Sequence, residues 1–214
     1  MQDVKIEDME LLKDKLIDAA CELFTATGYN GVTVRMIAAR AGVDSREFYY
    51  VFSSKEELLE NVVGHITDDE VTQIKAICCA QDDPLGRLMD VVRFMLGCRS
   101  SRGLLVNLVE KRSVIINNMF RENIMDKATP LLAEVIESGV KAGTLRACEP
   151  RHTAMFIINS VSYVFYYMIT GDDREDTLAM ATALIQMLCA TLGIKPDAAA
   201  EDAASLQKFL IASA

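Results

Sequence analysis

The chain has 214 residues, of which 51% are hydrophobic and 25% are charged, and its formal net charge is −9. This length and composition can bury a sizeable core, as one large domain or two small ones, which excludes a disordered tail. An acidic balance also argues against nucleic-acid binding, because proteins of that class are usually basic. The first 15 residues mix charged and apolar groups without the apolar run of a signal peptide, so we expect a cytoplasmic protein.

Six cysteines and two histidines are the residues most able to hold a metal, but none of the cysteines forms a C-x-x-C pair. We therefore expect buried thiols and no metal or cofactor. The adjacent Cys78 and Cys79 leave one alternative open, a redox-sensitive pair. Residues 152–169 contain no Asp, Glu, Lys or Arg, yet the run is short for a membrane span and includes polar groups. A helix buried against protein is the favoured interpretation.

The N-terminal residues predict a compact unit of three helices. Apolar residues recur at helical spacing from about residue 8 to Thr27, and Gly28 ends this helix. Two short helices follow, with Thr33 and Asp44 as their N-caps. Gly42 lies between them and can adopt the positive φ that a sharp reversal needs. This pattern predicts a helix-turn-helix. A capping box, either Ser53-x-x-Glu56 or Ser54-x-x-Glu57, opens a fourth helix that continues to about residue 79.

The rest of the chain predicts further helices and no strand, because period-2 alternation is absent. The expected segments are 84–98, a shorter apolar stretch at 104–109, 112–142 with Pro130 kinking or interrupting it, 150–170, 173–192 and 197–212. Gly143 to Leu145 form a stop and a turn. The predicted class is all-α, with a three-helix helix-turn-helix domain over residues 1–60 and a larger helical domain over 61–214.

Residues 12–60 resemble the TetR family of bacterial transcriptional regulators. The resemblance is carried by the run from Leu16 to Phe24, Gly28-Tyr29, Thr33 to Ala38, Ala41-Gly42-Val43, Phe48-Tyr49, Phe52, and Ser54 to Leu58. It implies a homodimer that binds a palindromic operator, usually as a repressor, and leaves DNA when a small, largely apolar effector enters the second domain. A recognition helix from Asp44 to Val51 would fit the major groove but needs a second copy for specificity.

The resemblance also implies roles for individual residues. Thr33, Tyr49 and Lys55 would contact phosphates, although a plain cap is the alternative for Thr33 and simple packing is the alternative for Tyr49. Arg35 and Arg46 would contact the backbone or the bases, and Tyr50 points toward the groove by helical phase. The predicted DNA-binding residues are Thr33, Arg35, Asp44, Ser45, Arg46, Tyr49, Tyr50 and Lys55. Arg40 is expected only to be solvated.

Two acids depart from the family pattern within the recognition helix. Asp44 and Glu47 stand three residues apart and are suited to an acidic capping box. Near phosphates the same charges repel. Two outcomes stay open: weaker, salt-sensitive DNA binding, or a carboxylate that accepts a hydrogen bond from a cytosine amino group.

The second domain needs both an effector pocket and a subunit interface. The resemblance implies that the helices at about 150–170 and 173–192 pair with their mates in a four-helix bundle. Candidate effector-binding residues are Phe94, Met95, Cys98, Leu105, Met119, Phe120, Met155, Asn159 and Tyr163, for which ordinary core packing is the alternative. Asn159 and Tyr163, one turn apart, form the best polar pair.

Two other functions are weighed against this one. Cys148 and His152 are four residues apart, but no third group is available to orient them, so we do not expect an enzyme. A helical interaction protein of the same fold that has lost specific DNA binding is the main alternative, because the N-terminal domain is acidic.

Overall fold

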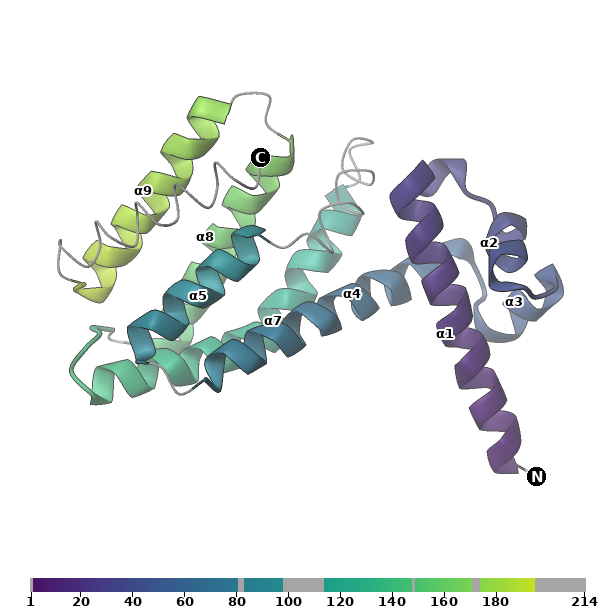
Figure 1. The fold of residues 1–214 in the computed structure, drawn as a ribbon, viewed down its shortest axis with the longest axis horizontal. Coiled ribbons are helices and arrows are strands. Elements are labelled where there is room, and N and C mark those ends of the chain that lie inside the picture. The colour runs from purple at the N-terminus through teal and green to yellow at the C-terminus, as the bar shows by residue number, and fades with distance from the viewer. Residues whose placement is uncertain (1, 81–82, 98–113, 148, 171–173, 195–214) are drawn as a thin grey trace. The chain divides into compact units, whose positions relative to one another are not determined.

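The structure is a computed structural model that describes residues 2–80, 83–97, 114–147, 149–170 and 174–194. Every regular element in these ranges is a helix (Figure 1), which confirms the all-α class. The predicted segments 104–109 and 197–212 lie outside the described residues. So do Cys98, Leu105 and Cys148.

The chain divides into two compact units, and two helices are shared between them. Of the described residues, one unit holds 2–68 and 114–120, and the other holds 69–80, 83–97, 121–147, 149–170 and 174–194. Helix α4, Lys55–Cys78, passes from the first unit into the second, as does α7, Val114–Lys141. The domain boundary predicted near residue 60 therefore falls inside a continuous helix.

The N-terminal unit is built from α1 (Gln2–Thr27), a short 3-10 turn η1 (Tyr29–Gly31), α2 (Val34–Ala41), α3 (Ser45–Val51) and the first part of α4. Helix α1 packs on both α2 and α3, as Figure 1 shows. It begins about two turns earlier than the apolar periodicity predicts, because its first residues are charged and carry no stripe. The core is apolar throughout, and its largest fully buried side chains are Leu16, Phe24, Ile37, Phe48, Phe52 and Leu58.

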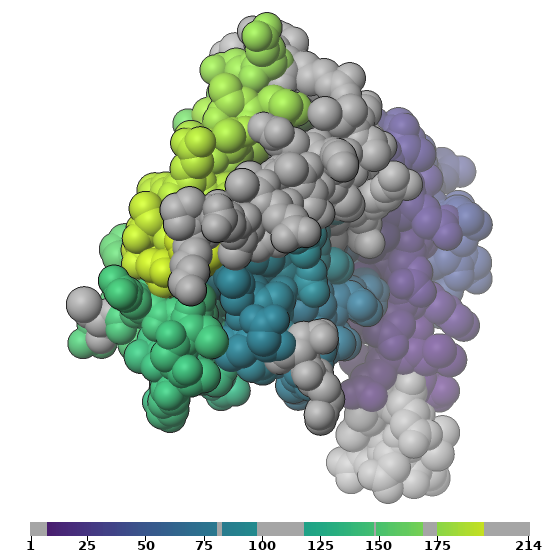
Figure 2. All heavy atoms as spheres, turned by 60° about the vertical axis from the view of Figure 1, so that its left-hand side comes forward, coloured from purple at the N-terminus to yellow at the C-terminus, as the bar shows by residue number. Residues whose placement is uncertain are grey.

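The second unit contains α5 (Pro84–Gly97), α8 (Pro150–Thr170), α9 (Arg174–Leu192) and most of α7. Helix α8 packs against both α5 and α9, and Figure 2 shows α9 in yellow-green on the surface. Helix α7 continues through Pro130. The expectation that the proline interrupts this helix is therefore wrong. Within the described residues, no helix is long and apolar enough to cross a membrane.

Three helix ends meet around Arg87 in the second unit. One guanidinium nitrogen, Nη1, donates to the carbonyl oxygen of Cys78 at the end of α4, at 2.8 Å. The other, Nη2, donates to the hydroxyl of Ser138 near the end of α7, at 3.2 Å. A Cβ built on Gly139 would lie 2.6 Å from Cδ1 of Leu145, so only glycine lets the chain fold back over the end of α7 there. Arg87 thus links the end of α4 to the end of α7.

Candidate nucleic-acid interface

Helices α2 and α3 form the predicted helix-turn-helix, and local contacts set its geometry. The hydroxyl of Thr33 accepts a hydrogen bond from the backbone nitrogen of Met36 at 3.3 Å and so caps α2. Gly42 ends α2 with φ 72°, in the left-handed region where glycine carries little strain. Val43 then donates to the carbonyl of Ala38 at 3.0 Å, which closes the turn. The predicted N-cap and turn are both confirmed.

An acidic capping box opens α3, as the sequence predicts. Oδ1 of Asp44 accepts from the backbone nitrogen of Arg46 at 2.8 Å. Oε2 of Glu47 reaches back to the backbone nitrogen of Asp44 at 2.7 Å. Each carboxylate satisfies a backbone N–H group that the helix itself leaves without a partner. The two acids therefore stabilise the first turn of the helix.

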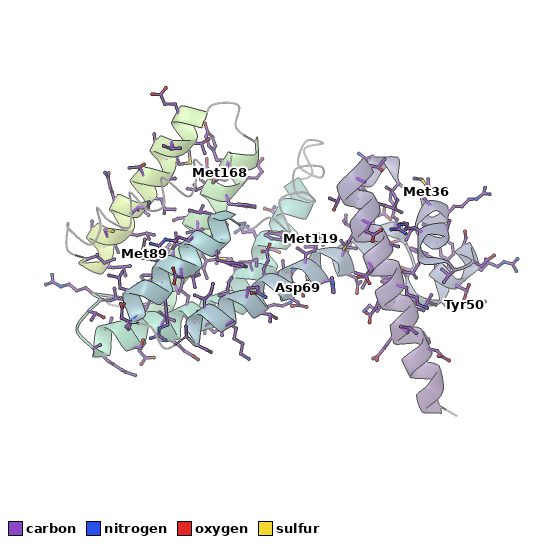
Figure 3. All side chains as sticks on the ribbon, in the orientation of Figure 1. Met36, Tyr50, Asp69, Met89, Met119 and Met168 are labelled. Atoms are coloured by element: carbon purple, nitrogen blue, oxygen red, sulfur yellow. The ribbon has the colours of Figure 1, made fainter. Side chains whose placement is uncertain are left out.

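The two faces of α3 differ sharply in exposure. Phe48 is fully buried and Phe52, just beyond the helix, is 2% exposed. Tyr49 and Tyr50 are 60% and 68% exposed, and Figure 3 shows Tyr50 projecting from α3 away from the core. The aromatic residues of this segment thus divide into a pair that holds the helix in place and a pair that is free to contact DNA.

Lys55 is turned toward the protein. Its ammonium donates to the carbonyl oxygens of Tyr29 at 3.0 Å and Val32 at 2.9 Å, and it lies 3.9 Å from the centre of the Tyr29 ring. Burial lowers the pKa of Lys55, while the neighbouring Glu56 raises it. These bonds use two of the three ammonium hydrogens, so one is left for the phosphate contact that the resemblance implies. In the structure Lys55 mainly closes the segment between α1 and α2.

Tyr29 and Glu56 complete this cluster, whereas the sequence predicted only a capping role for Glu56 and no contact for Tyr29. The Tyr29 hydroxyl donates to Oε1 of Glu56 at 2.9 Å. Burial, and after it this hydrogen bond, raises the pKa of Tyr29, so the phenol stays protonated. The Gly28-Tyr29 and Lys55-Glu56 motifs are adjacent in space but 27 residues apart in sequence, and helical periodicity carries no signal that they meet.

Two of the four cations of the helix-turn-helix stretch are engaged by the protein itself. Residues 33–55, all of which the structure describes, carry four cations, and Arg40 forms an ion pair with Glu22 of α1. Lys55 is turned inward as described above. Arg35 is exposed, and the side chain of Arg46 is 90% exposed. Arg35 and Arg46 are therefore the cations of this stretch best placed to meet DNA.

Helix α4 opens with a cap that differs in one detail from either predicted box. The backbone nitrogen of Glu57 donates to the Ser54 hydroxyl at 3.1 Å, as expected for Ser54-x-x-Glu57. The Glu57 carboxylate, however, accepts from the backbone nitrogen and the hydroxyl of Ser53, at 2.7 and 2.5 Å. These hydrogen bonds lower the pKa of Glu57. Glu57 thus binds one residue further back because Ser53 offers two donors.

The predicted effector-binding residues do not all fall together. Phe94 and Met95 on α5 and Met155 on α8 are half-buried within the second unit. Met119 and Phe120 instead pack against the core of the N-terminal unit, which differs from the expectation that they line an effector pocket. The reason is that the start of α7 belongs to the N-terminal unit, which apolar spacing along one helix cannot reveal.

The predicted polar pair on α8 is split between two environments. Asn159 is half-buried, and its Oδ1 accepts from Nη1 of Arg121 on α7 at 3.3 Å. Tyr163 is 61% exposed and shares an outer face of α8 with Phe156, which is 65% exposed. Residues 156 and 163 are seven apart and so lie on one side of the helix. The partner of Asn159 is therefore Arg121, and Tyr163 belongs to an exposed aromatic face.

Of the two adjacent cysteines, Cys78 meets the expectation of a buried thiol and Cys79 does not. Cys78 is buried, and burial raises its pKa to about 11, so it is protonated at neutral pH. Cys79 is exposed. Arg87 holds the carbonyl of Cys78, the peptide group that would have to rearrange to join the two sulfurs. Among the described residues, no group of His, Cys, Asp or Glu is suited to holding a metal ion.

A helical chain with a capped helix-turn-helix and an exposed recognition helix has the features of a DNA-binding transcriptional regulator. The family model for bacterial regulatory proteins of the tetR family matches residues 16–62. This match confirms the resemblance to the TetR family over residues 16–62, and curated proteins that the chain is similar to are transcriptional regulators.

Individual relatives agree with this assignment. The chain is 25% identical over 173 residues to the HTH-type transcriptional repressor KstR2 of Rhodococcus jostii, covering 78% of this chain and 85% of that one. It is similar in fold to RolR in complex with resorcinol, with TM-score 0.63, 16% identity, and 96% and 95% of the two chains covered. It is also similar to FadR of Bacillus subtilis in complex with stearoyl-CoA, with TM-score 0.61, 17% identity, and 83% and 98% covered. The curated relatives KstR2 of Rhodococcus jostii and RutR of Escherichia coli are transcriptional regulators, in agreement with the expectation that the chain is not an enzyme.

Proposed function

We propose that this chain is a ligand-responsive repressor that acts in the cytoplasm as a homodimer on a palindromic operator. In this proposal a small, largely apolar effector enters the second unit and releases the DNA. The observation that carries the proposal is the exposed face of a capped recognition helix, α3, whose other face is anchored in the core by Phe48.

The size of α3 supports a dimer. A helix of seven residues is about 10 Å long, which is enough to enter one major groove but touches few base pairs. Two copies on one face of the duplex supply the rest of the specificity. The exposed side chains that we assign to DNA are Arg35, Arg46, Tyr49 and Tyr50. We assign Thr33 and Ser45, at the starts of α2 and α3, and the remaining ammonium hydrogen of Lys55 to the DNA backbone.

The surface of α8 and α9 supports the same conclusion. Phe156 and Tyr163 on α8 are exposed, and Met187 on α9 is 49% exposed. Large exposed apolar side chains on two packed helices are typical of a surface that another protein covers. A second copy of α8 and α9 covering this face gives an isologous four-helix bundle.

The proposed effector site lies among the half-buried residues of the second unit. Phe94, Met95 and Met155 offer apolar contact, and the Arg121–Asn159 pair offers a cation and an amide. RolR and FadR were solved with ligands as different as resorcinol and stearoyl-CoA. The fold therefore tolerates many ligands, and the proposal specifies only an apolar body with a polar group. Helix α4 runs through both units and is the element we expect to carry the signal.

Fluorescence anisotropy with labelled duplexes from the DNA that flanks its own gene tests this function. We expect binding that weakens steeply with salt, and a dimer by sedimentation equilibrium. Tyr163→Arg should give a monomer with weaker DNA binding, whereas Arg151→Glu, an exposed position on the same helix, should leave the dimer intact. If no fragment is bound at any salt concentration, the chain is instead a helical interaction protein that has lost specific DNA binding.

A further inference from the structure

Two charged side chains on the exposed face of the recognition helix are placed to read bases. The side chains of Arg46 and Asp44 are 90% and 63% exposed, and Nε of Arg46 lies 3.6 Å from Oδ1 of Asp44. We infer that this pair determines operator specificity. Arg46 donates to a guanine, and Asp44 accepts from the exocyclic amino group of a neighbouring cytosine or adenine. The inference rests on the proposed function, since it requires α3 to enter the major groove.

The chemistry of the major groove makes these two partners selective. The guanidinium fork of arginine matches the O6 and N7 acceptors of guanine. An ionised carboxylate only accepts hydrogen bonds, and cytosine and adenine are the bases that present an amino donor in this groove. A guanine or thymine opposite Asp44 would set acceptor against acceptor. Asp44 therefore penalises wrong sequences as well as favouring the right one.

The two acidic residues at the start of α3, Asp44 and Glu47, have different roles. Glu47 is half-buried, and its Oε2 lies 2.7 Å from the backbone nitrogen of Asp44, so its role is to hold the helix. Asp44 is bonded to the backbone nitrogens of Arg46 and Glu47. A carboxylate has about four acceptor positions on its two oxygens, so Asp44 caps the helix and keeps capacity for a base.

The charges of the helix-turn-helix favour a large contribution of base contacts to DNA binding. Binding that is independent of sequence comes mainly from cations that neutralise phosphates. Arg40 is paired with Glu22 and Lys55 faces the protein, which leaves Arg35 and Arg46 opposite Asp44 and Glu47. These four charges sum to zero. We therefore expect weak binding to arbitrary DNA, with discrimination supplied by the bases that Arg46 and Asp44 contact.

Selection from a random duplex library with the full-length wild-type chain supplies the test sequence. Dissociation constants are then measured by anisotropy for that duplex and a scrambled one at a single salt concentration. Asp44→Asn removes the charge and keeps a good N-cap. We expect it to bind the scrambled duplex more tightly and to reduce the ratio of the two affinities about tenfold. Repeated selection should show relaxed preference at one position in each half-site.

Glu47→Gln is the matched control, because it makes the same change in charge and keeps the capping box. It should strengthen binding to both duplexes by the same factor and leave the ratio unchanged. Unchanged circular-dichroism melting shows that both variants fold. If the ratio for Asp44→Asn equals that of the wild type, or follows Glu47→Gln, Asp44 is only a local charge and the inference is overturned. If the wild-type chain selects no duplex, the proposed function fails, and this inference with it.

Discussion

The two units of this chain hold their helix ends in different ways. In the N-terminal unit the ends of α2, α3 and α4 are closed by residues two to four positions away, among them Thr33, Asp44, Glu47 and Glu57. In the second unit Arg87 joins the end of α4 to α7 across 9 and 51 residues. The backbone nitrogen of Arg146 likewise donates to the carbonyl of Leu192, at 2.8 Å.

This difference has a functional consequence. Local capping sets the first turn of the recognition helix, and Phe48 anchors that helix in the core. In the second unit, hydrogen bonds between distant residues join α4, α5 and α7, so we expect a change at one of these helices to affect the others. The unit proposed to sense an effector is thus the one whose helix ends depend on each other.

Phe48→Ala is expected to have the largest effect, because it removes a fully buried aromatic ring that anchors α3. We expect a loss of about 3–5 kcal/mol in the free energy of unfolding. Hydrogen exchange should show faster exchange across α1, α2 and α3. The neighbouring Tyr49→Ala, at a 60% exposed position, is the control and should change stability far less. Equal losses in the two variants would show that α3 is not anchored through Phe48.

Arg87→Met tests the long-range connection in the second unit. The variant keeps the aliphatic stem but leaves the Cys78 carbonyl and the Ser138 hydroxyl without their donor. We expect about 1–3 kcal/mol of destabilisation, measured by urea unfolding. Arg35→Met, at an exposed position, should stay within about 0.5 kcal/mol of the wild type. A wild-type stability for Arg87→Met would mean that these helix ends are held by packing alone.

Substituting two glycines that have open space around them tests backbone strain without a steric clash. A Cβ added at Gly42 or at Gly64 meets nothing within 4 Å, but Gly42 has φ +72° and Gly64 lies inside α4. Gly42→Ala should therefore destabilise the chain by about 1–2 kcal/mol. Gly64→Ala should stabilise it by roughly 0.5–1 kcal/mol. Thermal melting of the two variants should move in opposite directions, and a shift in the same direction would contradict the left-handed turn at Gly42.

A change of pH is expected to have the smallest effect on the stability of the chain. Hydrogen bonds from Ser53 lower the pKa of Glu57 below its ordinary value of 4.5. The unfolded chain therefore binds a proton more readily than the folded one, so this contribution to stability is present above about pH 4.5 and is lost as the pH falls below it. Glu57→Gln should flatten the loss of stability between pH 5 and 3, followed by chemical denaturation. The same acid dependence in wild type and variant would rule out this contribution.

Much of the N-terminal unit could be predicted because its signals are local. The Thr33 cap, the Gly42 turn and the Asp44–Glu47 capping box could all be predicted, since each joins residues at most five positions apart. The all-α class and most helix boundaries followed from apolar periodicity for the same reason. The start of α1 was missed because its first residues carry no apolar stripe.

The amino-acid sequence is enough to predict a helix-turn-helix with its caps, its turn and the residues of its exposed helix. The contacts between elements far apart in the chain depend on the tertiary structure. It turned Lys55 onto the carbonyls of Tyr29 and Val32, assigned Met119 to the N-terminal core, and set Tyr163 on an outer face of α8. The physical reason is that helical spacing identifies which residues share a face, whereas the partner of that face depends on packing between segments far apart in the chain.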